Sequence, residues 1–376
     1  MVLTASGGGI SSARWTARVF RELRADPELG ADFASSVLLV SSVSGGGVGA
    51  MYFVDRYGPG GPPSIADAED AVRWSGRSSL DATAWGLAYP DFARKFIPLN
   101  GALLPAWMRT DRALAMEGRW AEFWGAGRPV PTLRSWRRGV AEGWRPLQVF
   151  NATTVETGQR MLFTPADWPV DGARARSAPL SFLSACPGLD TGVPTAARLS
   201  ATFPYVTPIA RPGFPPGYAG ATGASSFHVA DGGYYDNFGT VTAVEFLSQI
   251  LPRVAEWNRE NPSRKRRVLV VETRLLEPEI RPPEEGSAGW IYGAAGPLLT
   301  LFTVRGAAQA ARGNTEFVLL RARWNDAVPL DRVTFSTGRG SPLSWHLTGA
   351  EATAVDQAWD RKENQAELTR LKTFWR

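Results

Sequence analysis

Side chains that bind metal ions or form disulfides are scarce in this chain. It contains one cysteine, Cys186, and two histidines, His228 and His346. A single cysteine excludes an internal disulfide and any site with several thiolates. No His-x-x-x-His or Cys-x-x-Cys pair occurs, so a zinc site would have to depend on carboxylates. This inventory argues against metal catalysis.

Long apolar runs are also missing. No stretch approaches the ~20 residues of a membrane-spanning helix. The longest runs, Val37–Val40 and Gly296–Val304, indicate a core strand and a buried helical turn. The start, Met1–Ser6, lacks the charged and apolar parts of a secretory signal. We expect a protein that is cytoplasmic or peripheral at a membrane. A strand that begins near residue 2 predicts a compact N-terminus or a domain cut from a longer chain.

Lysine is scarce too, and arginine supplies most of the formal net charge of +5. A basic surface can attract lipid headgroups or nucleic acid. The only dense basic run, Arg264–Arg267, directly precedes the apolar stretch Val268–Val271, which is typical of a solvated strand entry. No nucleic-acid-binding motif is present, so a nucleic-acid binder is the least favoured reading.

Strand and helix patterns alternate along the chain. This alternation predicts a three-layer α/β/α sandwich with a central, mostly parallel sheet. No repeat or linker divides the sequence, so we expect one domain over residues 1–376, with a core at about 2–350 and a C-terminal helix over 347–375. The expected strands are Val2–Ala5, Val37–Val40, Leu147–Phe150, Arg160–Phe163, Phe227–Ala230 and Val268–Val271. The expected helices are one capped by Ser11 or Ser12, one after Ser44, a mostly helical region Ser64–Trp124, Thr240–Leu251 and the tail.

Ser44 is the first residue that could perform chemistry. It follows a predicted strand and precedes a predicted helix, in the pattern small-x-Ser-x-Gly. Such a nucleophile elbow needs small residues two positions before and after the serine, because the strand and helix backbones approach closely. Those positions are Ser42 and Gly46. Gly45 can offer its backbone N–H to an oxyanion. The other interpretation is a glycine-rich turn that binds phosphate or nothing.

Three consecutive glycines, Gly7, Gly8 and Gly9, follow the first predicted strand. Their N–H groups can form a nest for an anion. One role is an oxyanion hole for acyl transfer. The other is pyrophosphate binding by a dinucleotide fold, with Asp32 about 20 residues onward. The match to that fingerprint is weak, because Ser12 replaces its third glycine.

Asp231 stands at the end of an apolar strand, before two glycines. Asp-Gly is also a common turn dipeptide. His228 precedes Asp231 by three residues on the same predicted strand, so its side chain should point to the opposite face of the sheet. His346 is predicted to lie in a loop or at a helix cap. The base for Ser44 is therefore predicted to be a carboxylate whose proton affinity is raised by partial desolvation. Hydrolysis should then fall at acid pH, without the inflection near neutrality that a histidine base gives.

Three motifs in order resemble the patatin-like phospholipases: Ser6-Gly7-Gly8-Gly9-Ile10, Ser42-Val43-Ser44-Gly45-Gly46 and Asp231-Gly232-Gly233-Tyr234-Tyr235-Asp236-Asn237. The segments 151–154 and 198–204 also look like bacterial members, and the resemblance covers about residues 2–350. It implies that Gly7–Gly9 form the oxyanion loop, that Ser44 is acylated and that Asp231 is the base. It further implies that no metal or other cofactor is used.

The sequence departs from the family pattern at two positions. Ser11 stands where the family usually has Arg or Lys, so either Arg14 or no residue takes that role. Ser42 stands where the elbow usually has glycine, which limits its backbone angles. Both changes could lower activity. Many bacterial relatives carry membrane-spanning helices before the glycine loop. Here the glycine loop follows directly on the start of the given sequence, which leaves the native localisation open.

The motifs together predict a lipid acyl hydrolase, a phospholipase A or lysophospholipase-type esterase. We expect a lipid or phospholipid substrate, possible peripheral membrane contact and no nucleic acid; the sequence does not indicate the oligomeric state. The regions Ser64–Trp124 and Pro208–Ser226 are expected to frame the acyl pocket. The alternatives are a catalytically silent patatin-like binding scaffold and, less favoured, a dinucleotide-binding oxidoreductase.

Overall fold

A computed structural model gives the fold of the chain. It describes residues 1–96, 110–168, 178–202, 207–212, 218, 227–275, 290–338 and 344–376, and the backbone but not the side chains of 94–95 and 290–303. Most of the predicted pocket loop 208–226 therefore lies outside the described residues, as does 97–109 of the predicted helical region. None of the helices in the described ranges has both the length and the apolar character needed to span a bilayer.

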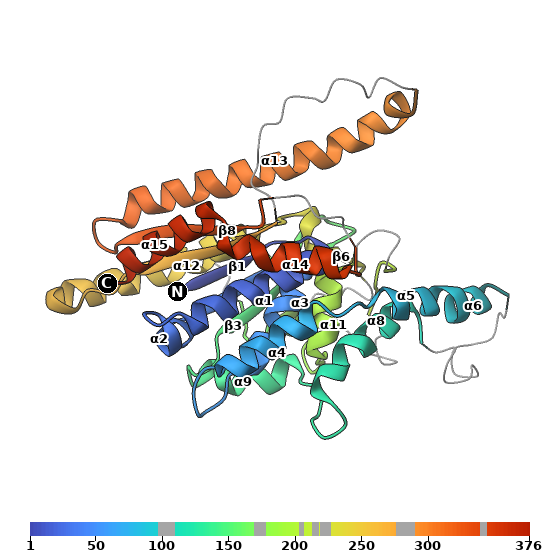
Figure 1. Ribbon diagram of the computed structural model, residues 1–376, viewed down its shortest axis with the longest axis horizontal. Coiled ribbons are helices and arrows are strands. Elements are labelled where there is room, and N and C mark those ends of the chain that lie inside the picture. Colours follow the sequence, from blue (N-terminus) through green and yellow to red (C-terminus); the bar gives the residue numbers. More distant parts are fainter. Residues whose placement is uncertain are drawn as a thin grey trace.

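A single mixed sheet organises the described chain (Figure 1). Five neighbouring strands, in the order β3-β2-β1-β7-β8, run parallel. Beyond β3 the sheet continues through the antiparallel β4 and then β5, and β6 also pairs with β3 in antiparallel fashion. The strands are β1 (Val2–Ala5), β2 (Leu39–Val43), β3 (Leu147–Thr154), β4 (Arg160–Phe163), β5 (Leu180–Ser181), β6 (Val229–Asp231), β7 (Val268–Arg274) and β8 (Leu330–Ser336).

Helices cover both faces of this sheet, which makes the fold a three-layer α/β/α sandwich, as predicted. The helices are α1 (Gly9–Ala25), α2 (Gly30–Ser35), α3 (Gly45–Asp55), α4 (Ile65–Ser75), α5 (Leu80–Gly86), α6 (Phe92–Phe96), α8 (Arg112–Ala121), α9 (Leu133–Ala141), α10 (Phe182–Ala185), α11 (Val193–Ser200), α12 (Thr240–Glu260), α13 (Trp290–Trp324), α14 (Gly349–Gln357) and α15 (Lys362–Trp375). A π-helical turn over Leu87–Asp91 joins α5 to α6.

The strands supply two separate apolar cores because successive side chains point to opposite faces. On β1, Leu3 packs into a core shared with α1, α3 and α4, whereas Val2 packs into a core with α12 and α13. The alternation repeats on β7, where Leu269 faces the first core and Val270 the second. Burial on both faces explains why these strands read as continuous apolar runs.

The structure corrects several predicted boundaries. The second strand is β2, shifted toward the elbow from the predicted Val37–Val40. Helix α1 begins earlier than predicted, with Gly8 at its N-cap position, and Ser11 and Ser12 lie buried inside its first turns. The predicted tail helix over 347–375 is divided into α14 and α15.

Candidate active site

Ser44 occupies a strained turn between β2 and α3. Its φ of 51° and ψ of −127° make it the only non-glycine residue with positive φ in the described ranges. L-residues pay about 1–2 kcal/mol for such a conformation, which persists only where the surroundings impose it. Its backbone N–H donates to Ser200 Oγ over 3.0 Å, and that hydroxyl donates to the Asn151 carbonyl over 2.5 Å. The elbow is thus fixed to α11 and β3.

The glycines after Ser44 allow α3 to approach the neighbouring segments. A Cβ on Gly45 would lie 1.8 Å from the Gly9 carbonyl oxygen, and one on Gly46 would lie 2.6 Å from the Ala5 carbonyl oxygen. Such distances cannot be tolerated, so both positions require glycine. The elbow and the glycine loop after β1 are therefore in direct backbone contact, as expected where neighbouring parallel strands end at the same edge of a sheet.

The glycine loop has a backbone that side chains rarely permit. Gly8 and Gly9 have φ values of 150° and 62°. The Gly7 N–H donates to the Asn237 carbonyl over 2.9 Å, so it is already committed to the protein. Within the described residues no acceptor faces the N–H groups of Gly8, Gly9 and Gly45. Of the predicted oxyanion donors, these three stay available.

Asp231 reaches Ser44 through the pairing of β6 with β3. Asp231 lies opposite Ala152 on β3, and the preceding residue on β3, Asn151, lies opposite Val43 on β2. Its Oδ1 accepts the Gly233 N–H over 2.7 Å, whereas Oδ2 is buried without a hydrogen bond of good geometry in the described structure. A buried carboxylate oxygen without a partner is a costly arrangement.

Burial raises the pKa of Asp231 from 3.8 to about 6. The Gly233 N–H, the Ser44 hydroxyl and the positive charge of Arg305 each lower it in part. The Ser44 hydroxyl therefore lies beside the Asp231 carboxylate. The structure brings together the nucleophile and base predicted from the sequence, and both are 6% exposed.

Helix α13 supports this site in a way that the sequence did not indicate. Gln309 is 7% exposed and donates from Nε2 to the carbonyls of Gly233, over 3.1 Å, and Tyr234, over 3.3 Å. Its Oε1 accepts the Asn237 N–H over 3.0 Å. Since Asn237 also holds Gly7, one glutamine links the loop after Asp231 to the glycine loop. Gln309 belongs to no recognisable motif, so only the fold reveals it.

The two departures from the family pattern have structural explanations. Arg14 does not fix the glycine loop, because its guanidinium pairs with Asp356 on α14. Ser11 is fully buried, and its hydroxyl has no hydrogen-bond partner among the described residues. The loop is held from elsewhere: the Ile10 N–H donates to the Ser344 carbonyl over 2.9 Å.

Ser42 is accommodated within the elbow. Its hydroxyl donates to the Val149 carbonyl over 3.0 Å and accepts from Gln148 over 2.7 Å. Its φ is not positive, so a side chain is permitted there.

Neither histidine contacts this site. The Nδ1 atom of His228 pairs with Glu156 at 2.5 Å, and the residue lies just before β6 on the surface. His346 is exposed in the loop before α14. Asp32 lies exposed in α2 and not at the end of a second strand, which argues against the dinucleotide interpretation.

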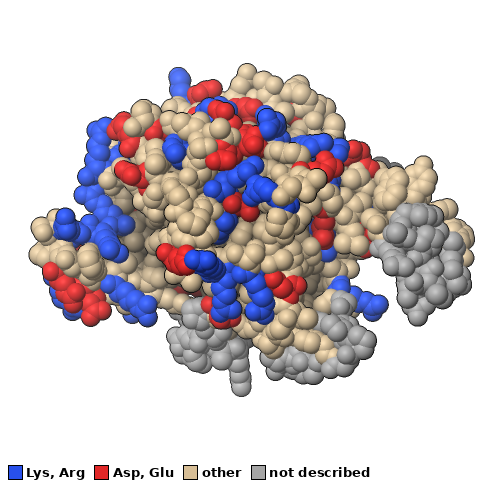
Figure 2. Space-filling model, turned by 90° about the horizontal axis from the view of Figure 1, so that it is seen from below, with Lys and Arg blue, Asp and Glu red and all other residues tan. Residues whose placement is uncertain are grey.

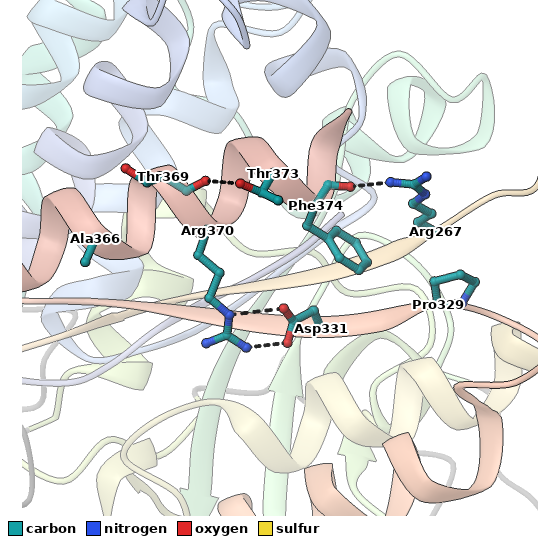
Figure 3. Close-up of a pocket in the computed structure, with 8 residues that line it drawn as sticks. All are labelled: Arg267, Pro329, Asp331, Ala366, Thr369, Arg370, Thr373 and Phe374. Atoms are coloured by element: carbon teal, nitrogen blue, oxygen red, sulfur yellow. Dashed lines mark hydrogen bonds and ion pairs between the residues drawn. The ribbon is translucent and has the colours of Figure 1, made fainter.

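Other concave or charged places offer no better site. The described residues contain no cluster of His, Cys, Asp and Glu able to hold a metal ion. A surface groove lies where β7 and β8 begin, between them and α15, at the opposite end of the sheet from Ser44 (Figure 3). Its polar side chains are already engaged within the protein, since Arg370 pairs with Asp331 and Arg267 donates to the Phe374 carbonyl.

Comparison with known proteins gives remote likenesses. No protein-family model and no curated protein matches the sequence. The crystal structure of VipD from Legionella pneumophila aligns with a TM-score of 0.39 and 10% identity, covering 98% of this chain and 66% of VipD. That of the type III effector protein ExoU aligns with a TM-score of 0.34 and 13% identity, covering 99% and 53%. The chain thus spans just under two thirds of the length of VipD and about half of the length of ExoU.

Proposed function

We propose that this protein is a serine acyl hydrolase that cleaves carboxylic esters of lipids, of the phospholipase A or lysophospholipase type. The observation that carries the proposal is Ser44, held in a strained elbow beside a buried Asp231 whose pKa is raised to about 6. Strain and a perturbed carboxylate in one place are costs that a purely structural turn does not need. The resemblance of the three sequence motifs to patatin-like phospholipases supports the same reaction.

In the proposed reaction Ser44 Oγ attacks the ester carbonyl carbon, and its proton passes to Asp231. Negative charge develops on the carbonyl oxygen, where the N–H groups of Gly8, Gly9 and Gly45 can donate to it. The tetrahedral intermediate collapses, the C–O bond breaks and the leaving alcohol takes the proton from Asp231. Water then attacks the acyl-serine and delivers its proton through Asp231 back to Ser44, which releases the fatty acid. A pKa nearer to neutrality makes this carboxylate a stronger base than an exposed aspartate.

The test compares hydrolysis of p-nitrophenyl esters by the unaltered protein, Ser44→Ala and Asp231→Asn. Asp32→Asn serves as the matched control, because it removes an exposed carboxylate far from the elbow. We expect the first two substitutions to lower kcat by at least about 10³-fold and the control to leave it unchanged. A fluorophosphonate probe should label the unaltered protein and not Ser44→Ala. Hydrolysis that survives Ser44→Ala would contradict the assignment of the nucleophile, and no hydrolysis together with no labelling would favour the silent scaffold.

A further inference from the structure

An arm of the molecule presents aromatic side chains to solvent. We use "apolar arm" for residues 80–96, which comprise α5, the π-helical turn and α6. In Figure 1 the arm projects from the body at the end where β6 and α11 lie. Its outward side chains are Trp85, Tyr89, Phe92 and Phe96, with 42%, 59%, 58% and 69% of their surface exposed. Their spacing of four, three and four residues places them along one helical face.

The pattern of the arm is the reverse of an ordinary surface helix. Its inner face consists of the small or compact residues Thr83, Gly86 and Pro90, which are buried. A Cβ on Gly86 would lie 2.4 Å from the Arg112 Cα, so the arm packs closely on α8 through these residues and turns its rings away. Monomeric soluble proteins rarely expose such a contiguous apolar stripe unless it meets a partner or a membrane.

The acidic side chains of the arm are neutralised. Asp81 pairs with Arg119 at 3.1 Å, and Asp91 pairs with Arg112 at 2.9 Å. Figure 2 shows that blue and red side chains are interspersed over the described part of the face it presents. An apolar, aromatic stripe without uncompensated negative charge fits the boundary between lipid headgroups and acyl chains, where Trp and Tyr are favoured.

The arm also begins beside the proposed oxyanion loop. The N–H of Ser79, at the start of α5, donates to the Trp345 carbonyl over 3.1 Å. The adjoining Ser344 carbonyl accepts the Ile10 N–H, and a Cβ on Gly9 would lie 2.4 Å from that oxygen. A surface touching the arm therefore lies at the same end of the molecule as Ser44. We propose that the apolar arm inserts into the surface of a lipid bilayer and brings the Ser44 site to its substrate; the choice of a bilayer as occupant rests on the function proposed above.

Vesicle flotation tests the inference without depending on catalysis. Ser44→Ala protein is mixed with phosphatidylcholine vesicles at 0.1 and 0.5 M NaCl, alone and with the further pair Tyr89→Ser and Phe96→Ser. The control pair is Val318→Ser and Leu319→Ser on α13, whose 61% and 65% exposure matches that of the arm pair. We expect binding that persists in high salt, falls on the order of 100-fold with the arm pair and changes less than about twofold with the control pair.

The inference would be overturned if Ser44→Ala protein did not float with the vesicles, or if both pairs of substitutions weakened vesicle binding equally. It would also be overturned if 0.5 M NaCl abolished binding, which would indicate that the basic run 264–267 binds the vesicles. Finally, dissociation of a dimer by the arm pair in sedimentation velocity would indicate that a second copy of the chain occupies the arm. In protein with Ser44 intact, the arm pair should slow hydrolysis of vesicle lipid much more than hydrolysis of a soluble short-chain ester. Failure of the proposed function would appear as absent ester hydrolysis, with the flotation result unaffected.

Discussion

The substitution Asp231→Asn should stabilise the protein at the pH where it abolishes activity. The pKa of this carboxyl rises from 3.8 to about 6 on folding. Because the folded pKa is the higher one, its contribution to stability is fully present below pH 3.8 and is lost as the pH rises through 6. A shift of about two pH units corresponds to a loss of about 3 kcal/mol in the free energy of unfolding.

The pH dependence makes this prediction specific to the charge. From the two pKa values, the ionised carboxyl costs about 1.5 kcal/mol at pH 5 and about 3 kcal/mol at pH 8. Effects of the substitution on the free energy of unfolding that do not involve charge, such as a weaker hydrogen bond from the Gly233 N–H, are the same at both pH values. The advantage of Asp231→Asn over the unaltered protein should therefore grow by about 1.5 kcal/mol between pH 5 and pH 8.

Urea unfolding of both proteins at pH 5, 6.5 and 8 measures this difference. Asp32→Asn is again the control, because it removes an exposed carboxylate and not a buried one. A constant difference for Asp231→Asn across the range, or one that shrinks toward pH 8, would refute the reasoning. It would mean that the carboxylate is solvated or paired with a cation in the folded protein.

Three further predictions concern the same site. The rate of ester hydrolysis should rise with pH around an apparent pKa of about 6, which is set by the Asp231 base. His228→Gln and His346→Gln should leave this pH profile unchanged. A profile altered by either substitution would place a histidine in the reaction. Ser44→Gly should raise the free energy of unfolding by about 1 kcal/mol relative to Ser44→Ala, because only glycine adopts a positive φ without strain; equal unfolding midpoints would show that the turn is relaxed. Gly45→Ala should unfold at clearly lower urea concentration than the unaltered protein, because its Cβ would meet backbone atoms. The control Gly118→Ala, at an open helical position, should be neutral or stabilising by up to about 1 kcal/mol. Similar effects of the two substitutions would contradict the close contact at the elbow.

The sequence predicts those parts of the site that depend on local geometry. The small residue pattern around Ser44 is demanded by the approach of α3 to β1, as the fit at Gly46 shows. The three-layer fold was likewise predictable, because buried parallel strands read as apolar runs.

For Asp231 the sequence predicted that its pKa would be raised, but not by how much. Partial desolvation was expected to raise its proton affinity, but a hydrolysis profile without an inflection near neutrality was also expected. Burial in fact moves its pKa to about 6, within the range of an ordinary histidine. A pH profile alone therefore does not distinguish an aspartate base from a histidine base, and the histidine substitutions are needed.

Features that depend on distant contacts could not be read from the sequence. The Gly7 N–H is committed to Asn237, which removes it from the expected set of oxyanion donors. Gln309 lies in α13 without any motif, and its role follows only from where that helix packs. The apolar arm was expected to be helical, but an apolar stripe normally predicts a face turned to the core. Only the burial of Thr83, Gly86 and Pro90 reveals that the rings face outward.

The unfavourable backbone conformation of Ser44 and the buried carboxyl of Asp231 explain why several segments are needed to hold these two loops in place. A positive φ at Ser44 and a buried, ionisable Asp231 both favour relaxation of the two loops that carry them. The elbow is held through Ser200 by its bond to the Asn151 carbonyl, and the loop after Asp231 is held by Gln309. These anchors bind backbone groups and not the side chains of Ser44 and Asp231. The fold thus maintains an unfavourable local arrangement without occupying the groups that acyl transfer would use.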